Sequence, residues 1–183
     1  MAMFKGIKSF TPCCRYRVTI PWDSLLQSLA RYRKNYKLIE NPDFQRGHVW
    51  VEAQRIAYVE FILRGGSTGR EIYFNCTSWM DGFNTPLILV DGLQRITAVE
   101  RFLTNQIPAF GYLFKEYSDN IPFDCEFFFS IHNLKTRAKV LKWYIELNSG
   151  GIVHTPEEIN KVIRLLEEEK EHDCDGKIFD REI

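Results

Sequence analysis

The sequence predicts a mixed α+β domain in which a small mixed sheet is surrounded by helices. Its 183 residues suffice for one ordinary domain, and 45% of them are hydrophobic, enough to form a buried core. Short segments with strand patterns are interspersed along the chain with longer segments of helical periodicity. Residues 1–14 form an N-terminal extension, and residues 167–183 are polar, which predicts a solvated helix end or a disordered tail.

Five short segments are predicted to be strands. The first of them alternates, with Tyr16, Val18 and Ile20 on one face. The third is a continuous apolar run, which is typical of a buried central strand. The five segments are Arg15–Ile20, Glu71–Asn75, Leu87–Val90, Phe110–Phe114 and Cys125–Ile131.

Five further segments are predicted to be helices, because their apolar residues recur at intervals of three and four. Asn148 and the glycines after it resemble the end of the fourth helix. Thr155 and Glu158 have the spacing of a capping box, and Pro156 suits the first position of the last helix. The segments are a helix opening at Pro21, Trp50–Leu63, Leu93–Leu103, Leu134–Leu147 and a helix beginning at Thr155.

Composition argues against several classes of protein. Lys+Arg and Asp+Glu both total 24, so the formal net charge is zero, which disfavours a globally basic nucleic-acid binder. Five cysteines without a CxxC pair disfavour a zinc ribbon and a disulfide scaffold, and the four histidines lack metal-ligand spacing, so we predict no metal site. The apolar runs are too short to span a bilayer, and the N-terminus lacks the apolar core of a signal peptide. We therefore expect a soluble cytoplasmic protein with reduced thiols and no membrane partner.

The most informative stretch is LILVDGLQRITAVERFL, residues 87–103. A predicted strand ends at Asp91-Gly92, and a predicted helix starts at once. Such a joint gathers free backbone N–H groups and the positive end of the helix dipole, which together suit an anion. The positive charge of Arg95 in the first turn is repelled by the positive end of the helix dipole, which costs free energy. A phosphate bound between them would attract both and turn this repulsion into a favourable interaction. The alternative is that Arg95 pairs with a carboxylate, Asp91 or Glu100, and that Asp91 caps the helix.

The polar loop NPDFQRGHVW carries another Gln-Arg pair, Gln45-Arg46, before a predicted helix. Arginine offers a planar fork of donors that suits phosphate oxygens, so the arginines of the two stretches could bind one polyanion together. Two unrelated surface arginines are the alternative. We expect Trp50 to anchor the following helix in the core rather than to stack on a base.

Three short motifs occur in a fixed order along the chain. Residues 42–50, PDFQRGHVW, match P-x-(aromatic)-Q-R-x-x-V-W, and residues 91–97, DGLQRIT, match D-G-x-Q-R-(aliphatic)-T. Residues 147–151, LNSGG, with Glu158-Ile159, match LN-x-x-G followed by E-(I/L). Together these motifs resemble the N-terminal domain of the GmrSD-type, modification-dependent restriction endonucleases, a family marked by a DGQQR motif. The resemblance covers about residues 15–166.

The resemblance implies a ParB/sulfiredoxin-like fold and a nucleotide-binding domain over residues 15–166, and some members of the family hydrolyse NTPs. A nucleoside triphosphate would then be the ligand. Its Mg²⁺ would be held largely by phosphates and by Asp91, which is also the candidate for orienting an attacking water. The catalytic candidates are Asp91, Gln94 and Arg95, and the nucleotide-binding candidates are Gln45, Arg46, Gly92 and Asn148.

Two features depart from the family pattern. Leu93 replaces the first Gln of DGQQR, so a contact from that side chain is missing. Full-length relatives continue into a second domain, often a His-Asn-His nuclease, which we do not expect in this chain; His132-Asn133 is not that motif. If the protein is an enzyme, we therefore expect a nucleoside triphosphatase and not a nuclease.

Two alternatives stay open. One is a DNA-binding or regulatory module of a phage or mobile element, whose arginines contact DNA phosphates. The basic cluster Arg31–Lys34 with Lys37 supports it, unless that cluster is only a solvated helix end. The other is an inhibitor or decoy that pairs with a larger restriction-enzyme relative.

Overall fold

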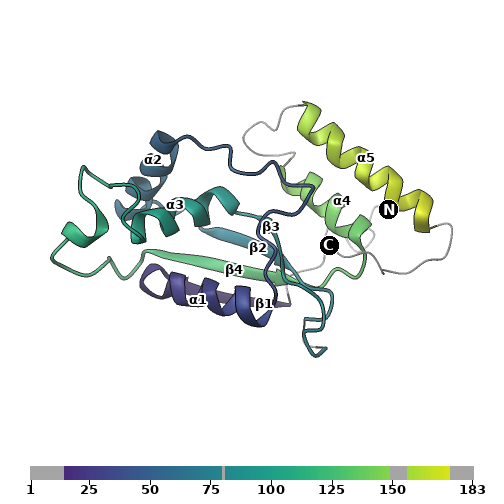
Figure 1. Ribbon diagram of the computed structural model, residues 1–183, viewed down its shortest axis with the longest axis horizontal. Coiled ribbons are helices and arrows are strands. Elements are labelled where there is room, and N and C mark those ends of the chain that lie inside the picture. The colour runs from purple at the N-terminus through teal and green to yellow at the C-terminus, as the bar shows by residue number, and fades with distance from the viewer. Residues whose placement is uncertain (1–14, 80, 149–155, 174–183) are drawn as a thin grey trace, which may run out of the picture.

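A four-stranded mixed sheet forms the centre of the structure, a computed structural model that describes residues 15–79, 81–148 and 156–173 (Figure 1). The strands lie in the order β1-β4-β2-β3. β1 pairs with β4 and β2 with β3 in antiparallel fashion, whereas β2 and β4 are parallel. The strands are β1 (Tyr16–Pro21), β2 (Glu71–Asn75), β3 (Ile88–Asp91) and β4 (Glu126–His132). The prediction of a mixed α+β chain with a small mixed sheet is confirmed.

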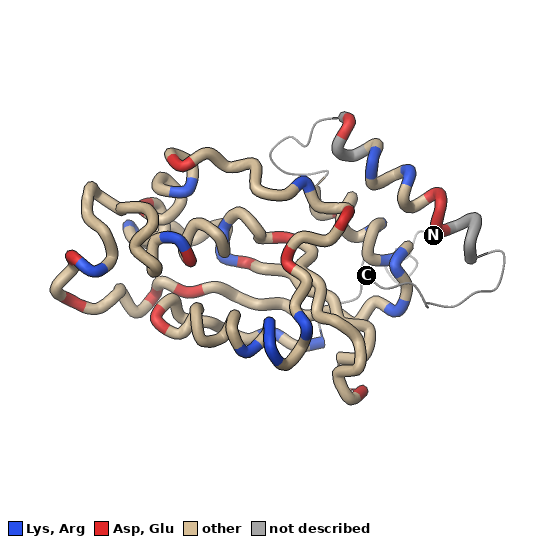
Figure 2. Tube along the Cα trace, in the orientation of Figure 1, with Lys and Arg blue, Asp and Glu red and all other residues tan. Residues whose placement is uncertain are grey.

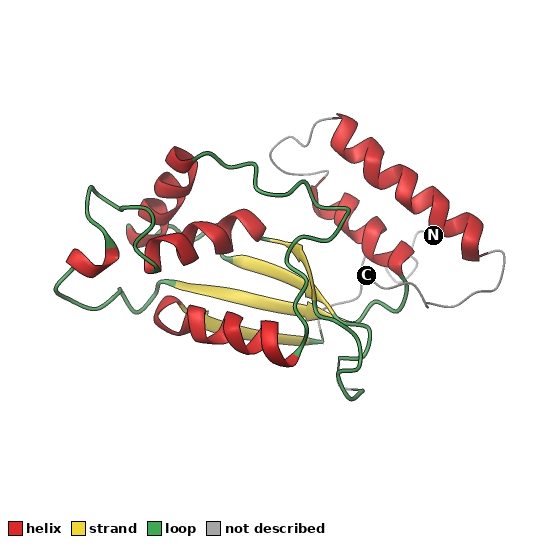
Figure 3. Ribbon diagram, in the orientation of Figure 1, coloured by secondary structure: helices red, strands yellow, loops and turns green. Residues whose placement is uncertain are grey.

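Five α-helices surround this sheet in the described part of the chain (Figure 3). They are α1 (Trp22–Asn35), α2 (Glu52–Leu63), α3 (Leu93–Leu103), α4 (Arg137–Asn148) and α5 (Pro156–Asp173), with a short 3₁₀ helix η2 (Phe114–Glu116). Among the described residues, no helix combines the length and the apolar character that a bilayer crossing requires.

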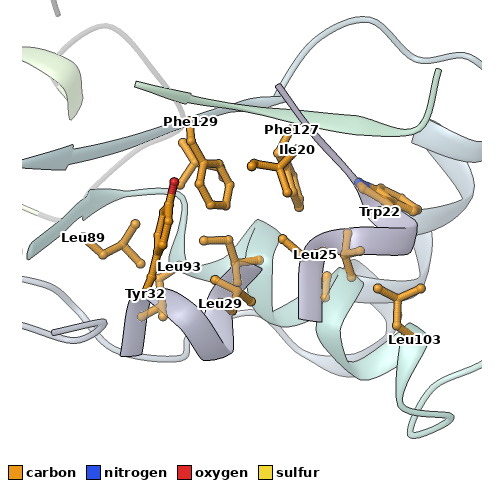
Figure 4. Close-up of a cluster of buried hydrophobic side chains, with 14 of the residues drawn as sticks. Ile20, Trp22, Leu25, Leu29, Tyr32, Leu89, Leu93, Leu103, Phe127 and Phe129 are labelled. Carbon is orange, nitrogen blue, oxygen red and sulfur yellow. The ribbon is translucent and has the colours of Figure 1, made fainter. Parts of the chain in front are cut away.

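The main core lies on one face of the sheet. Alternate residues of β4, Phe127 and Phe129, point to this face together with Phe74 of β2. Leu25 and Leu29 of α1 pack against them, and α2 and α3 add their apolar faces to the same cluster (Figure 4). These side chains are fully buried, and each contributes about 1.5–3 kcal/mol through burial.

A second, smaller core lies on the opposite face and is centred on β3. Ile88 and Val90 pack there against Leu141 and Tyr144 of α4, together with Phe44 from the loop before α2. The intervening residue of β3, Leu89, belongs to the main core. β3 is therefore covered on both faces, which explains its continuous apolar sequence.

The prediction that Leu87–Val90 is a central strand is wrong. β3 is the last strand of the described sheet, and its outer edge is covered by a single extended residue. Ile39 donates its N–H to the carbonyl of Leu87 at 2.8 Å and accepts the N–H of Leu89 at 2.9 Å. Burial of both faces, and not a central position, accounts for the apolar run.

The predicted strand Phe110–Phe114 is also wrong. Ala109 and Tyr112 close a tight turn by exchanging backbone hydrogen bonds of 2.8 and 2.9 Å. Phe110 and Gly111 both have positive φ, 49° and 85°, which no strand allows. Phe114 packs edge-on against Phe102 of α3 with ring centroids 5.5 Å apart, whereas the ring of Phe110 lies under the guanidinium of Arg64 at 4.9 Å.

Several terminal predictions lie outside the described residues. They concern the extension 1–14, the Ser149–Gly151 helix end, the capping-box residue Thr155 and the chain beyond residue 173. Within the described part, α5 continues to Asp173, so the polar stretch that starts at Glu167 is helical as far as that residue.

Candidate functional site

The joint between β3 and α3 depends on Gly92. Its φ is +114°, and a Cβ there would lie 2.5 Å from Cδ1 of the buried Ile72. The helix starts at the next residue, Leu93, and no side chain caps it. The N–H of Ile96 is the first to bond back, to the carbonyl of Gly92 at 3.0 Å. The alternative in which Asp91 caps the helix is therefore wrong, and the N–H groups of the first turn have no partner within the helix.

Asp91 is instead the ion-pair partner of Arg95. One carboxylate oxygen lies 2.5 Å from Nη2 of Arg95, and the two side chains are 35% and 17% exposed. Of the two carboxylates considered for Arg95, Glu100 pairs with Arg33. A partly exposed pair of this kind contributes only about 0.2–1 kcal/mol to stability, so a phosphate with two charges can compete with Asp91 for Arg95.

Two glutamines fix the loop of residues 45–50 against this joint. The side-chain amide of Gln94 donates to the carbonyl of Gly47, and its oxygen accepts the N–H of Trp50 at 3.1 Å. Gln45 donates to the carbonyl of Leu89 in β3 at 2.6 Å. Both side chains therefore hold the backbone of the loop and the strand in place.

These segments and the end of α4 enclose one pocket. All seven residues predicted for the site line it, from three separate parts of the chain: Gln45, Arg46, Asp91, Gly92, Gln94, Arg95 and Asn148. The cavity has a volume of about 100 Å³. That is below the range of about 300–1,000 Å³ for pockets that hold a whole drug-sized ligand, but phosphate groups would fit.

Two aromatic residues of the pocket were not predicted as site residues. Tyr144 lines the cavity and packs edge-on against Phe44 with ring centroids 5.2 Å apart. Within the predicted helix Leu134–Leu147, the helical spacing of Tyr144 from the other apolar residues indicates only a core position. Trp50 also lines the cavity while its ring packs on Tyr58 at 5.5 Å, so it anchors α2 and forms part of the pocket wall.

Asn148 reaches the pocket from the last turn of α4. Its side-chain amide donates to the carbonyl of Tyr144 at 2.7 Å, so it satisfies a carbonyl near the end of its own helix. This contact agrees with the helix-end interpretation of Asn148. The same residue lines the cavity, so the two interpretations of Asn148 are compatible.

The lining of the pocket is positive on balance. Arg46 and Arg95 contribute two positive charges, and among the described lining residues Asp91 is the one carboxylate. The start of α3 adds a partial positive charge of about one half.

Burial raises the pKa of Tyr58, and nearby Arg95 only partly opposes that shift. The phenol of Tyr58 therefore stays neutral near pH 7.

The described residues hold no group of three or more His, Cys, Asp or Glu side chains that could bind a metal ion. A single carboxylate such as Asp91 suffices for a Mg²⁺ ion whose other ligands are phosphate oxygens and water, which is the usual arrangement at nucleotide sites.

The basic cluster on α1 is partly neutralised. Arg33 contacts the carboxylates of Glu40 at 2.6 Å and Glu100 at 3.0 Å, and the guanidinium of Arg31 lies 5.7 Å from the ring centre of Tyr32. Figure 2 shows positive and negative residues intermixed along the described chain.

Comparison with protein-family models, with curated proteins and with solved structures gives no match to this chain.

Proposed function

We propose that this protein is a nucleotide-binding domain that holds the phosphates of a nucleoside triphosphate at the N-terminus of α3. One observation carries the proposal: seven residues chosen from three separated motifs line a single pocket. We further propose that the domain is related to the N-terminal domain of GmrSD-type restriction endonucleases and that its sheet belongs to the ParB/sulfiredoxin-like class.

Arg95 and Arg46 are the phosphate clamps in this proposal. Arg95 leaves the carboxylate of Asp91 for a phosphate oxygen, because a doubly charged phosphate beside the helix N-terminus gains from both the guanidinium and the dipole. Each charge-assisted hydrogen bond to phosphate contributes about 1.5–3 kcal/mol, which exceeds the strength of the partly exposed pair with Asp91.

The small cavity sets the position of the ligand. A volume of about 100 Å³ accommodates phosphate groups but not a whole nucleotide, so the nucleoside lies at the mouth of the pocket. Affinity then depends mainly on the number of phosphates and only weakly on the base.

Binding, and not hydrolysis, is the function that the contacts favour. Both ends of the Gln94 amide are engaged in holding the loop at Gly47 and Trp50, so Gln94 acts as a positioning residue. Leu93 cannot supply the polar group of the usual Gln. Asp91, once released from Arg95, is the remaining candidate both for contacting Mg²⁺ on the phosphates and for orienting a water.

The test is a calorimetric titration of the full chain with ATP, GTP, CTP, UTP and inorganic triphosphate, each with Mg²⁺, followed by phosphate-release measurements on the same samples. The proposal predicts saturable binding of all five compounds with similar affinities. Absence of binding by every compound would refute it, and a salt-sensitive affinity for DNA would then favour the DNA-binding alternative. Phosphate release would add a triphosphatase activity to the binding function.

A further inference from the structure

A second cavity lies at the opposite end of α3, far from the phosphate pocket. It has a volume of about 200 Å³. Its walls are mainly apolar side chains from the ends of α2 and α3 and from the connection between α3 and β4: Leu63, Phe102, Phe110, Phe114, Tyr117, Ile121 and Pro122. An apolar cavity of about 150 Å³ is large enough to bind benzene, so this one can accept a single aromatic ring.

The connection that forms this cavity runs from Thr104 to Cys125, and it makes up the left end of the molecule in Figure 1. A connection of this length inside a compact chain is unusual and commonly has a function of its own. Its backbone is fixed by several contacts. The N–H of Phe110 donates to Glu60 at 2.7 Å, and the hydroxyl of Tyr117 donates to the carbonyl of Ala109 at 2.6 Å. The cavity is therefore preformed.

Phe123 directly follows Pro122, which lines the cavity, and is 96% exposed, the most exposed large apolar side chain in the described part of the chain. It occupies a tight turn that is closed by the N–H of Cys125 and the carbonyl of Pro122 at 2.9 Å. The buried guanidinium of Arg70 fixes the same turn by donating to the carbonyl of Asp124 at 2.5 Å. The backbone that carries the ring is therefore held in place. Phe110 and Tyr112 of the same connection are also exposed, by 40% and 59%, and several exposed apolar side chains in one segment are typical of a contact surface.

We infer that this end of the protein is a homodimer interface in which Phe123 of each copy inserts into the cavity of the other. In a two-fold interface the same patch of each copy meets itself, so an inserted side chain and the hollow that receives it must both belong to that patch. Phe123 and the cavity meet this requirement, since Pro122 lines the cavity and precedes Phe123 in the chain. The size of the cavity matches the phenyl ring.

The charges near the cavity allow a second copy to approach. Asp119 lines it, and the guanidinium of Arg64 lies 4.9 Å from the ring centre of the lining residue Phe110. Lys115 and Glu116 directly follow the lining residue Phe114 in the chain. A mixed rim avoids the like-charge repulsion that a rim of one sign would impose on two identical surfaces.

The experiment is sedimentation equilibrium of the full chain from about 1 to about 300 µM, a range that covers weak dimers. The wild type is expected to pass from monomer to dimer in this range. Phe123→Ala removes the projection, and Asn120→Trp fills the hollow, because Asn120 is an exposed residue of the cavity lining. Each variant alone should remain monomeric at least tenfold beyond the wild-type midpoint.

The mixture of the two variants is the decisive sample. Phe123 of the Asn120→Trp chain can still enter the intact hollow of the Phe123→Ala chain, so the mixture should form a heterodimer with one insertion instead of two. Val51→Ala is the control. It removes an exposed apolar group at the start of α2, whereas Leu63 at the end of the same helix lines the cavity, so this change should leave the dimer unchanged. Circular dichroism melting curves should be alike for all chains, since exposed substitutions rarely affect stability. A wild type that stays monomeric, an unaltered dimer of Phe123→Ala, or a mixture that does not associate would each overturn the inference.

Discussion

Replacing Gly92 by alanine should destabilise the protein far more than an ordinary glycine-to-alanine change. The φ of +114° places any other residue in a strained region, at a cost of about 1–2 kcal/mol. The added Cβ would also lie 2.5 Å from Cδ1 and 3.1 Å from Cγ2 of the buried Ile72, and overpacking of this kind costs about 1–3 kcal/mol. The sum is about 2–5 kcal/mol of the free energy of unfolding.

Urea denaturation followed by tryptophan fluorescence measures this loss. Gly65→Ala is the matched control, because Gly65 has a similar positive φ of +83° but no atom within 4 Å of the added Cβ. The control should therefore lose only the backbone part, about 1–2 kcal/mol. Equal losses in the two variants would show that the contact between Gly92 and Ile72 does not restrict this position, and would refute the reasoning.

Two further predictions concern the loop contact and a buried thiol. Gln94→Leu should remove both hydrogen bonds to the loop at about 0.5–1.5 kcal/mol each and accelerate hydrogen exchange of the Trp50 amide; an unchanged exchange rate would contradict the positioning role. Burial raises the pKa of Cys125 from 9.0 to about 11, so the folded state holds this proton more tightly than the unfolded state. Stability should accordingly fall as the pH rises from about 9 to about 11, by up to about 3 kcal/mol from this group. Urea denaturation across this pH range measures the free energy of unfolding, which should fall less steeply with pH in Cys125→Ala than in the wild type. An identical fall in both proteins would contradict the raised pKa of Cys125.

Local sequence patterns correctly predicted those strands and helices whose structure depends on residues nearby in the chain. Glu71–Asn75 and Leu93–Leu103 have the predicted bounds, because an alternating or helical pattern and a turn glycine suffice to define them. Phe110–Phe114 failed because its aromatic residues pack in a long connection whose turns depend on distant partners such as Glu60. The outer edge of β3 is covered by Ile39, about fifty residues earlier, and no local pattern reveals that contact.

The same distinction applies to the site. The type of joint at Asp91-Gly92 follows from the sequence, since a glycine between an apolar strand and a helix predicts a tight turn. The contacts of Gln94 with Gly47 and Trp50 join residues more than forty positions apart, and they could not be predicted from spacing. Tyr144 enters the pocket because α4 packs across β3, which depends on the tertiary arrangement.

The most direct test of the proposed phosphate site is a comparison of nucleotide affinity between Arg95→Gln and Arg33→Gln by calorimetry with Mg²⁺-triphosphate ligands. Both changes remove one ion-paired arginine, but only Arg95 lines the pocket. Loss of a charge-assisted bond of about 1.5–3 kcal/mol predicts a decrease in affinity of about 10- to 150-fold for Arg95→Gln, with Arg33→Gln close to the wild type. Equal affinities in the two variants would contradict the assignment of the pocket as a phosphate site.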